Sequence, residues 1–161
     1  MKTKEWVINA VVASLYIVLT GFLAPFSFGA IQFRVGEILN HLVVFERKYI
    51  VGIVAGVFLS NLFFSSFGVY DLLFGVSHSL VSLFFTVLFT KNIENVRVKM
   101  GINSAMFAFF SFFIAAMLYF AAGLPFWITY ATVVLGELGV MLVGIPLMEY
   151  LNRRLLFSGK K

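Results

Sequence analysis

Six apolar runs, separated by short links, dominate the sequence, and all 12 Lys and Arg residues lie outside the runs. The runs cover residues 5–24, 36–45, 49–66, 70–90, 103–122 and 128–151. An α-helix needs about 20 apolar residues to cross the hydrocarbon core of a bilayer, and every run except the second approaches that length. The pattern predicts an all-α fold, an integral membrane bundle of six transmembrane helices that forms a single domain over residues 1–161.

The second run, residues 36–45, is too short to cross a bilayer alone. It can still contribute if it begins in the preceding loop, near Phe33, or if its ends are buried in protein, because irregular backbone at membrane depth is tolerated only there. We expect a span over residues 33–45, and whether residues 36–45 cross the membrane fully stays open. The first run follows Lys2 and Lys4 as in a signal peptide, but it is long and further runs follow it, so we expect it to stay in the mature protein.

Composition excludes other common classes of protein. Apolar residues make up 61% of the chain and charged residues 12%, whereas soluble domains have about half and about a quarter. Six spans leave no room for a soluble catalytic domain, so we do not expect an enzyme. The net charge of +5 does not indicate nucleic-acid binding, because the cations are scattered between apolar runs. With no Cys and only two His, we expect no metal and no other cofactor.

The placement of the cations predicts the orientation of the chain. The four sets are Lys2 and Lys4; Arg47 and Lys48; Lys91, Arg97 and Lys99; and Arg153, Arg154, Lys160 and Lys161. The positive-inside rule makes all four sets cytoplasmic, which requires six crossings and places both termini in the cytoplasm. The links expected outside are residues 25–35, 67–69 and 123–127, and only the first of them holds a cation, Arg34.

Ionisable side chains also occur within or beside the spans, where they are costly unless they are paired or hydrated. They are Arg34, Glu37, Asp71 and Glu137. All fall in the outer half of the predicted topology, which favours one cavity that opens outside and holds a polar ligand. A channel or a proton relay would need comparable groups in the inner half, where the sequence offers only weakly polar residues such as Ser82 and Thr86. A structural alternative is that Arg34 pairs with Glu37 or Asp71 to hold the outer loop, although this does not account for Glu137.

Other polar residues extend the candidate site. Glu37, Asn40 and His41 share one face if the second run is an α-helix, because they are three and four residues apart. Asn61, near the outer end of the third run, and His78, midway along the fourth, are further candidates. His78 is equally well explained as a buried neutral His bonded to a nearby Ser. His41 and Glu37 are too few ligands for zinc, which prefers three or more from the protein.

The link over residues 25–36 has too many apolar residues for a solvated loop and too much Gly, Pro and charge for a span. We expect it to fold over the mouth of the pocket as an outer gating loop, where Gln32 and Arg34 reach the ligand. Trp127 and Tyr130 stand at the outer end of the last run. They fit either an aromatic belt at the membrane surface or a stacking surface for a ligand.

Small residues recur at four-residue spacing in two runs. Gly52 and Gly56 form one pair, and Ala10 and Ser14 form another. Such pairs allow helices to approach closely. Because they are common in membrane proteins, packing within the chain is their simplest explanation.

Several short motifs match a known pattern. They are Gln-Phe-Arg-Val-Gly-Glu at residues 32–37, Asn61-Leu62, Asp71-Leu72-Leu73-Phe74-Gly75 and Gly136-Glu137. Together they resemble the QueT-type substrate-binding subunits of energy-coupling factor (ECF) transporters, with the Gln-Phe-Arg-x-x-Glu element as the specific part. The resemblance covers most of the chain.

The resemblance implies a six-helix subunit in the plasma membrane of a bacterium that captures a small heterocyclic nutrient, a queuosine precursor of the 7-deazaguanine type. It further implies three partners, a transmembrane coupling subunit and two cytoplasmic ATPase subunits. The chain has no GxxxxGK[ST] phosphate loop, so a partner must hydrolyse the ATP. In such families the coupling subunit docks on small-residue helix faces, which fits Ala10, Ala13 and Ser14.

A deazaguanine presents adjacent N–H and amino donors that a carboxylate accepts well, and Glu37, Asp71 or Glu137 could play that part. Which carboxylate does so stays open. Arg34 and Gln32 suit the ring carbonyl, and Phe33, Trp127 or Tyr130 could stack on the ring.

Other functions stay open at this point. A different vitamin precursor, such as hydroxymethylpyrimidine or a pyridoxine-like compound, suits the same polar residues. A solitary proton-coupled carrier with Glu137 as its proton site is a second class of protein that fits. An intramembrane enzyme fits poorly, since the sequence offers no nucleophile–base pair and no metal set.

Overall fold

The computed structural model describes residues 2–27 and 33–155, and within these residues it contains helices and no strands. The longer helices are α1 (Thr3–Phe22), α4 (Ile50–Phe64), α5 (Val76–Phe89), α6 (Val96–Phe110), α7 (Phe112–Ala122) and α8 (Phe126–Leu155). The shorter ones are α2 (Ala24–Ser27), the 3₁₀-helix η1 (Val35–His41), α3 (Leu42–Phe45), the 3₁₀-helix η2 (Arg47–Tyr49) and the π-helix η3 (Asp71–Gly75). The all-α fold predicted from the sequence is therefore confirmed.

Five helical segments of the described chain are long and apolar enough to cross a membrane. They are Thr3–Phe22, Arg47–Phe64, Asp71–Phe89, Val96–Ala122 and Phe126–Leu155. The fourth of these begins at Val96, earlier than the apolar run at residue 103, because Asn95 caps the helix. Its side-chain oxygen accepts hydrogen bonds from the backbone N–H groups of Arg97 and Val98 at 2.9 and 3.3 Å. Hydropathy alone misses this charged first turn.

The remaining helical segment, Val35–Phe45, is shorter than the other five. The 3₁₀ geometry of η1 stretches the chain, so the segment spans about 20 Å, against about 30 Å for a bilayer core. Most of its residues are buried, and η1 packs between α1 and α8. Protein, and not lipid, therefore surrounds this segment, which explains how so short a helix is accommodated.

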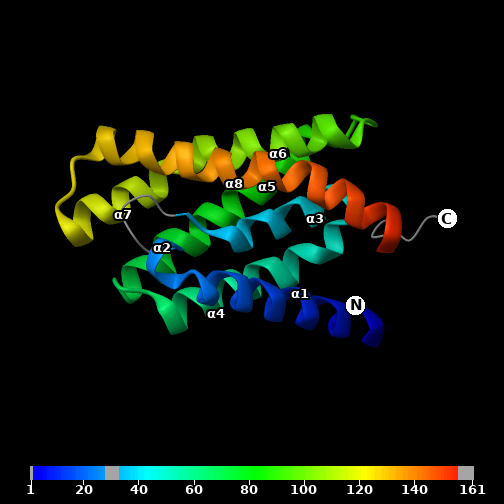
Figure 1. Ribbon diagram of the computed structural model, residues 1–161, viewed down its shortest axis with the longest axis horizontal. Coiled ribbons are helices and arrows are strands. Elements are labelled where there is room, and N and C mark those ends of the chain that lie inside the picture. Colours follow the sequence, from blue (N-terminus) through cyan, green and yellow to red (C-terminus); the bar gives the residue numbers. More distant parts are fainter. Residues whose placement is uncertain (1, 28–32, 156–161) are drawn as a thin grey trace.

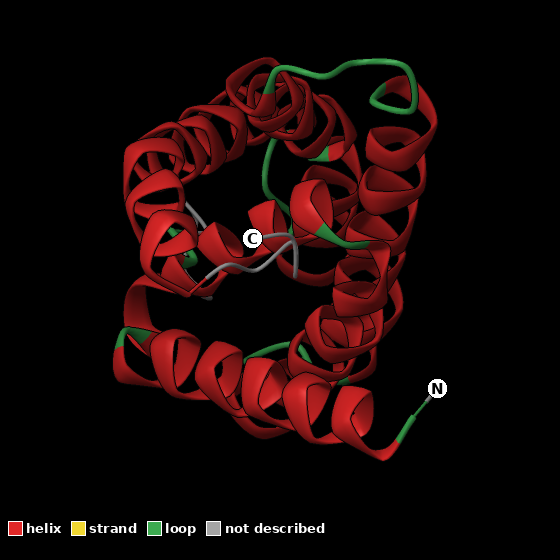
Figure 2. Ribbon diagram, turned by 90° about the vertical axis from the view of Figure 1, so that its right-hand side faces the viewer, coloured by secondary structure: helices red, strands yellow, loops and turns green. Residues whose placement is uncertain are grey.

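Both termini lie at the same end of the elongated molecule (Figure 1). Helices α1 and α4 pack side by side, as do α6 and α8, and η1 and α3 run between these two pairs. Viewed onto the end that carries the termini, the described chain consists of helices joined by short loops (Figure 2). The arrangement is a lengthwise helical bundle with one short helical segment in its interior.

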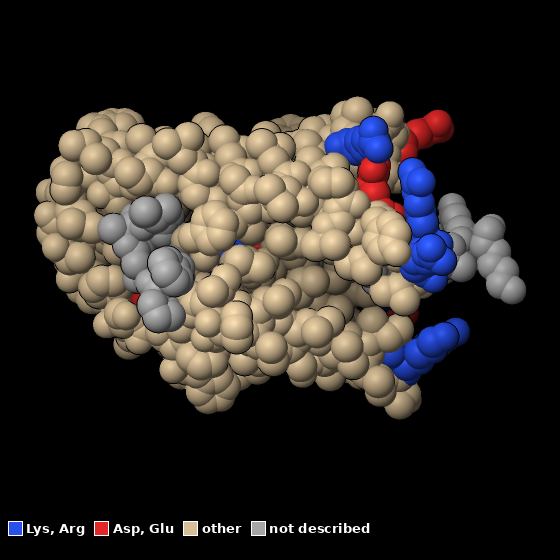
Figure 3. Space-filling view, in the orientation of Figure 1, with Lys and Arg blue, Asp and Glu red and all other residues tan. Residues whose placement is uncertain are grey.

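Charge is distributed unevenly along the bundle. In the face shown in Figure 3, the Lys and Arg side chains gather at the end where the termini lie, and most of the remaining surface is uncharged. Large apolar side chains such as Phe22, Phe84 and Phe120 are exposed on the sides of the bundle, with 86%, 63% and 64% of their surface accessible. An apolar belt beyond a cationic end is the surface expected of a membrane protein.

Helices α1 and α4 approach closely because α4 has glycines on the contact face. A Cβ at Gly52 would lie 2.6 Å from the Asn9 backbone oxygen, and the Gly52 N–H donates to Asn9 Oδ1 at 2.7 Å. A Cβ at Gly56 would lie 2.6 Å from Tyr16 Cβ. The Gly52 and Gly56 pair therefore packs within the chain.

Substitution of Gly52 by Ala is expected to lower stability in detergent by about 1–3 kcal/mol, because the new methyl group meets backbone that cannot move without separating α1 from α4. Thermal unfolding followed by intrinsic fluorescence measures the change. Gly101→Ala is the matched control, since a Cβ there meets nothing within 4 Å and Ala favours the helix. Equal stability of the two variants would show that the contact does not constrain the bundle.

Candidate binding site

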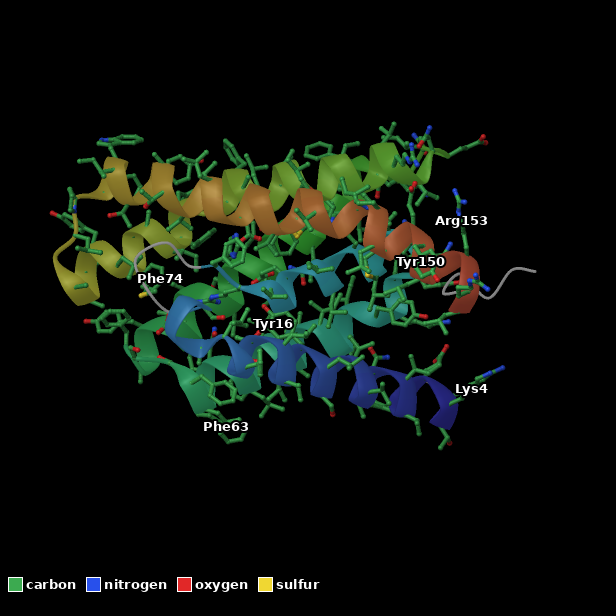
Figure 4. All side chains as sticks on the ribbon, in the orientation of Figure 1. Lys4, Tyr16, Phe63, Phe74, Tyr150 and Arg153 are labelled. Carbon is green, nitrogen blue, oxygen red and sulfur yellow. The ribbon has the colours of Figure 1, made fainter. Side chains whose placement is uncertain are left out.

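A group of polar side chains is buried around η1, and we call it the polar cluster. Its members are Tyr16, Arg34, Glu37, Asn40, Asn61, Asp71 and Glu137, and each is at most 4% exposed. They come from α1, η1 and the residue before it, α4, η3 and α8. Figure 4 shows Tyr16 deep between the helices, away from the end where Lys4 and Arg153 lie. The structure thus brings residues from all along the chain to one buried place.

The 3₁₀ geometry of η1 decides which of its side chains meet. Residues three apart lie on the same face of a 3₁₀-helix, which has about three residues per turn. Arg34, Glu37 and Asn40 therefore form one row. His41 points elsewhere, and its ring nitrogens lie 2.9 Å from the Met141 carbonyl oxygen and 3.1 Å from Asn103 Nδ2. The condition under which His41 would share a face with Glu37 and Asn40, an α-helix over these residues, is therefore not met.

Glu37 is held by two donors. The Tyr16 hydroxyl donates to Glu37 Oε1 at 2.7 Å, and Asn40 Nδ2 donates to Glu37 Oε2. Gly36 permits this arrangement, since a Cβ at that position would lie 2.5 Å from Thr20 Oγ1 and 3.2 Å from the Tyr16 backbone oxygen. The close approach of η1 to α1 therefore depends on a residue without a side chain.

Arg34 is anchored on the opposite side of the cluster. Its NH2 group lies 3.6 Å from Asp71 Oδ1, its Nε donates to the Ser27 backbone oxygen at 3.2 Å, and its NH1 donates to Asn61 Oδ1 at 3.4 Å. Asn61 Nδ2 in turn donates to the Asp71 backbone oxygen at 2.9 Å. The guanidinium group thus joins the segment before η1 to α4 and η3.

Asp71 is fixed from its other side as well. Its Oδ2 accepts hydrogen bonds from the Ser65 hydroxyl at 2.7 Å and from the Phe67 backbone N–H at 3.3 Å. It begins the π-helix η3, an irregular turn of a kind that is frequent at functional sites. Asp71 is therefore both the ionic partner of Arg34 and the link to the loop after α4.

Glu137 enters the cluster from α8. It shares a face of that helix with Met141, whose carbonyl oxygen lies 2.9 Å from His41 Nε2, and with Gly144, where a Cβ would lie 3.2 Å from the His41 ring. Glu137 is close enough to Glu37 and Arg34 to interact electrostatically with both. Its Oε1 atom is buried and has no hydrogen-bond partner among the described residues.

Hydrogen-bond acceptors exceed donors in the polar cluster. Three carboxylate side chains, Glu37, Asp71 and Glu137, accompany one guanidinium group. Asn40 Oδ1 is a second buried oxygen for which no partner is seen in residues 2–27 and 33–155. A buried acceptor without a partner costs about 1–3 kcal/mol, so two of them in one cluster are unusual for a purely structural network. The arrangement suits a guest molecule that brings donors.

Comparison with known proteins identifies the family. The model of the QueT transporter family matches residues 6–153. The queuosine precursor transporter QueT of Lactococcus lactis subsp. cremoris is 38% identical over 162 residues, and the alignment covers 95% of each chain. No solved structure matches the chain.

The chain belongs to the QueT transporter family. The resemblance found in the short motifs is therefore confirmed. The QueT family comprises transporters, so the protein is not an enzyme, and its apolar helices make it a multi-pass membrane protein.

Some candidate residues of this QueT family member lie elsewhere. Trp127 is 77% exposed on the outside of α8, and the Tyr130 hydroxyl donates to the Phe109 backbone oxygen at 3.0 Å. The structure does not bring either ring to the polar cluster. Gln32 lies outside the described residues, as do the other positions in the middle of the expected gating loop, residues 28–32. Of the described part of that loop, residues 25–27 belong to α2 and residues 35 and 36 to η1.

His78 stabilises a break between α6 and α7. The Ser111 backbone N–H bonds to Ala108 O at 3.3 Å, one residue short of an α-helical bond to Phe107 O. His78 Nε2 lies 2.9 Å from that Phe107 carbonyl oxygen, and the Ser111 hydroxyl donates to it at 2.9 Å. Of the alternatives predicted for His78, burial is observed, but its partner is a backbone carbonyl and not a Ser.

Two parts of the polar interior were not predicted from the sequence. Tyr16 was not a candidate, although Asn9, Tyr16 and Thr20 recur at helical spacing on the buried face of α1. The half of the bundle nearer its cationic end, which the sequence predicts to be the inner half, also holds a buried chain of hydrogen bonds, in which Asn103 joins His41 to the Thr86 hydroxyl at 3.1 and 2.9 Å. The expectation that this half offers only weakly polar residues was incomplete. Among the described residues, no group of three or more His, Asp or Glu is placed to hold a metal ion.

Proposed function

We propose that this QueT family member is the substrate-binding subunit of an ECF-type importer and that it captures a queuosine precursor outside a bacterial cell. The observation that carries the proposal is the buried polar cluster with two oxygens that lack donors. A relative of 38% identity is named as a queuosine precursor transporter, which supports the substrate class.

The orientation follows from charge. The cations gather at the end that carries both termini, and the positive-inside rule places this end in the cytoplasm of the bacterium. Arg34 immediately precedes η1, whose first residues lie away from that end, so we assign the polar cluster to the outer half of the plasma membrane.

The chemistry of a 7-deazaguanine fits a cluster rich in acceptors. The ring presents adjacent N–H and amino donors, which Glu137 Oε1 and Asn40 Oδ1 are free to accept within the described structure. Arg34, held by Asp71, supplies a donor for the ring carbonyl. Glu37 is already engaged by Tyr16 and Asn40, so its part is to fix Asn40.

The partners of the proposed importer are a transmembrane coupling subunit and two cytoplasmic ATPase subunits. A groove of about 340 Å³ between α1 and α4 is a suitable docking face for the coupling subunit. Ala10 and Ser14 line it and are exposed, whereas Ala13 is 7% exposed and contacts the Gly56 position of α4. The exposed small residues leave room for a partner helix to approach.

The substrate class is tested by calorimetric titration of the purified chain in detergent. We expect a 7-deazaguanine precursor of queuosine to bind one to one, and hydroxymethylpyrimidine and pyridoxine to bind at least about tenfold more weakly because they offer fewer adjacent donors. Tighter binding of either vitamin compound would support the role of a binding subunit but contradict the proposed substrate.

A proton-coupled carrier is the second candidate, and the buried chain from His41 through Asn103 to Thr86 favours it, because it extends polar groups into the inner half. Proteoliposomes that contain this chain alone separate the two functions. We expect no accumulation of ligand under a pH gradient, and ATP-dependent accumulation once an ECF module is added. Uptake driven by the gradient alone would establish the carrier.

A further inference from the structure

A second polar cavity lies at the cationic end of the molecule, and we call it the cationic hollow. It has a volume of about 340 Å³ and forms where the link between α3 and α4 meets the link between α5 and α6. Its polar lining consists of Glu46, Arg47, Lys48, Thr90, Lys91 and Lys99. Four cations therefore surround one concave surface together with a single carboxylate.

None of these four cations is neutralised by a salt bridge in the described part of the chain. The ion pairs present there are Arg34–Asp71 and Arg97–Glu149. Arg97, by contrast, is neutralised, because its Nε donates to both carboxylate oxygens of Glu149 at 2.8 and 2.9 Å. Lys48 makes only a contact with the ring of Tyr49, whose centroid lies 5.5 Å from Nζ. Unpaired cations that converge on a concave surface concentrate anions there.

We propose that the cationic hollow binds a phosphoryl anion. A tetrahedral phosphate accepts several charged donors at once, and the Arg47 fork and the three ammonium groups come from different segments that can surround it. The hollow has space for a phosphate and its nearest water molecules, since a water occupies about 30 Å³. A carboxylate would satisfy fewer of these donors.

The phosphoryl group has two possible sources. The cationic end of a membrane-spanning bundle is expected at the level of the lipid headgroups, so the headgroup of an anionic phospholipid is one source. Free inorganic phosphate is the other. The two sources share the same recognition chemistry, and an experiment with two arms separates them.

The first arm is native mass spectrometry of the purified chain in non-ionic detergent, titrated with phosphatidylglycerol and with phosphatidylcholine. The second arm is equilibrium dialysis with radiolabelled inorganic phosphate. Both arms compare the wild-type chain with the double variant Lys91→Gln/Lys99→Gln. The control is a second double variant with the same change in charge, Arg153→Gln/Arg154→Gln, on the last turn of α8. Arg47→Gln is an independent variant at an exposed position of the hollow.

We expect one anion per chain, bound about tenfold more weakly by the Lys91/Lys99 and Arg47 variants and unchanged in the control. This result with phosphatidylglycerol, and not with phosphatidylcholine, identifies a lipid headgroup. The same dependence with inorganic phosphate identifies a free anion. Equal binding by all variants, an equal loss in the Arg153/Arg154 control, or no binding of either probe overturns the proposal.

Discussion

Replacement of Glu137 by Gln is expected to weaken the binding of a 7-deazaguanine precursor by roughly 10- to 100-fold. The buried Oε1 of Glu137 has no donor within the described residues, so a ligand that supplies one gains a charge-assisted hydrogen bond. Such a bond contributes about 1.5–3 kcal/mol, which gives the expected range. The amide keeps the size of the side chain but loses the charge and half of the accepting capacity. Isothermal titration in detergent measures the affinity.

Glu149→Gln is the matched control for this substitution. It makes the same chemical change on the same helix, but Glu149 lies at the cationic end and pairs with the exposed Arg97. We expect its affinity to equal that of the wild-type chain. An unchanged affinity in Glu137→Gln, or an equal loss in both variants, would remove Glu137 from the binding site.

Replacement of Asp71 by Ala is expected to lower the free energy of unfolding by about 3–5 kcal/mol. Asp71 and Arg34 are 0% and 4% exposed, so loss of the carboxylate leaves a guanidinium group in a place that water does not reach. The Ser65 hydroxyl loses its acceptor as well, whereas the Phe67 N–H keeps the Ser65 hydroxyl oxygen at 3.0 Å. Thermal unfolding in detergent measures this loss directly.

Arg97→Ala is the control for a broken ion pair, because it removes the exposed partner of Glu149 and is expected to change stability little. The double variant Asp71→Ala with Arg34→Ala is expected to recover part of the lost stability, because it leaves no buried guanidinium group without its carboxylate partner. A single Asp71→Ala variant as stable as the Arg97→Ala variant would contradict a structural role for the buried pair.

Most of the fold follows from hydropathy, because five runs are long enough to cross a bilayer as helices. Hydropathy also located the short segment that ends at Phe45, but it did not indicate which type of helix the segment forms. The row of Arg34, Glu37 and Asn40 depends on η1 being a 3₁₀-helix, and no sequence rule distinguishes seven residues of that geometry from an α-helix. The early start at Val96 required attention to Asn95 as a cap.

The candidate site was predictable as a set of costly polar residues, since lipid excludes Arg34, Asp71 and Glu137 unless something receives them. Its internal pairing was not, because the contacts join segments far apart in the sequence. Tyr16 donates to Glu37 across 21 positions and only the packing of η1 on α1 brings them together. Trp127 was equally suitable as a ligand contact and as a membrane-surface residue. Only the packing of α8 in the bundle shows that its side chain faces outward.

The central claim is that the polar cluster receives the transported ligand. An experimental structure of the chain with a bound 7-deazaguanine precursor tests it most directly. We predict ligand density between η1 and α8, with ring donors within hydrogen-bond distance of Glu137 Oε1 and Asn40 Oδ1. Density elsewhere, such as in the apolar groove between α1 and α8 lined by Val11 and Met148, with the polar cluster unchanged, would contradict the account.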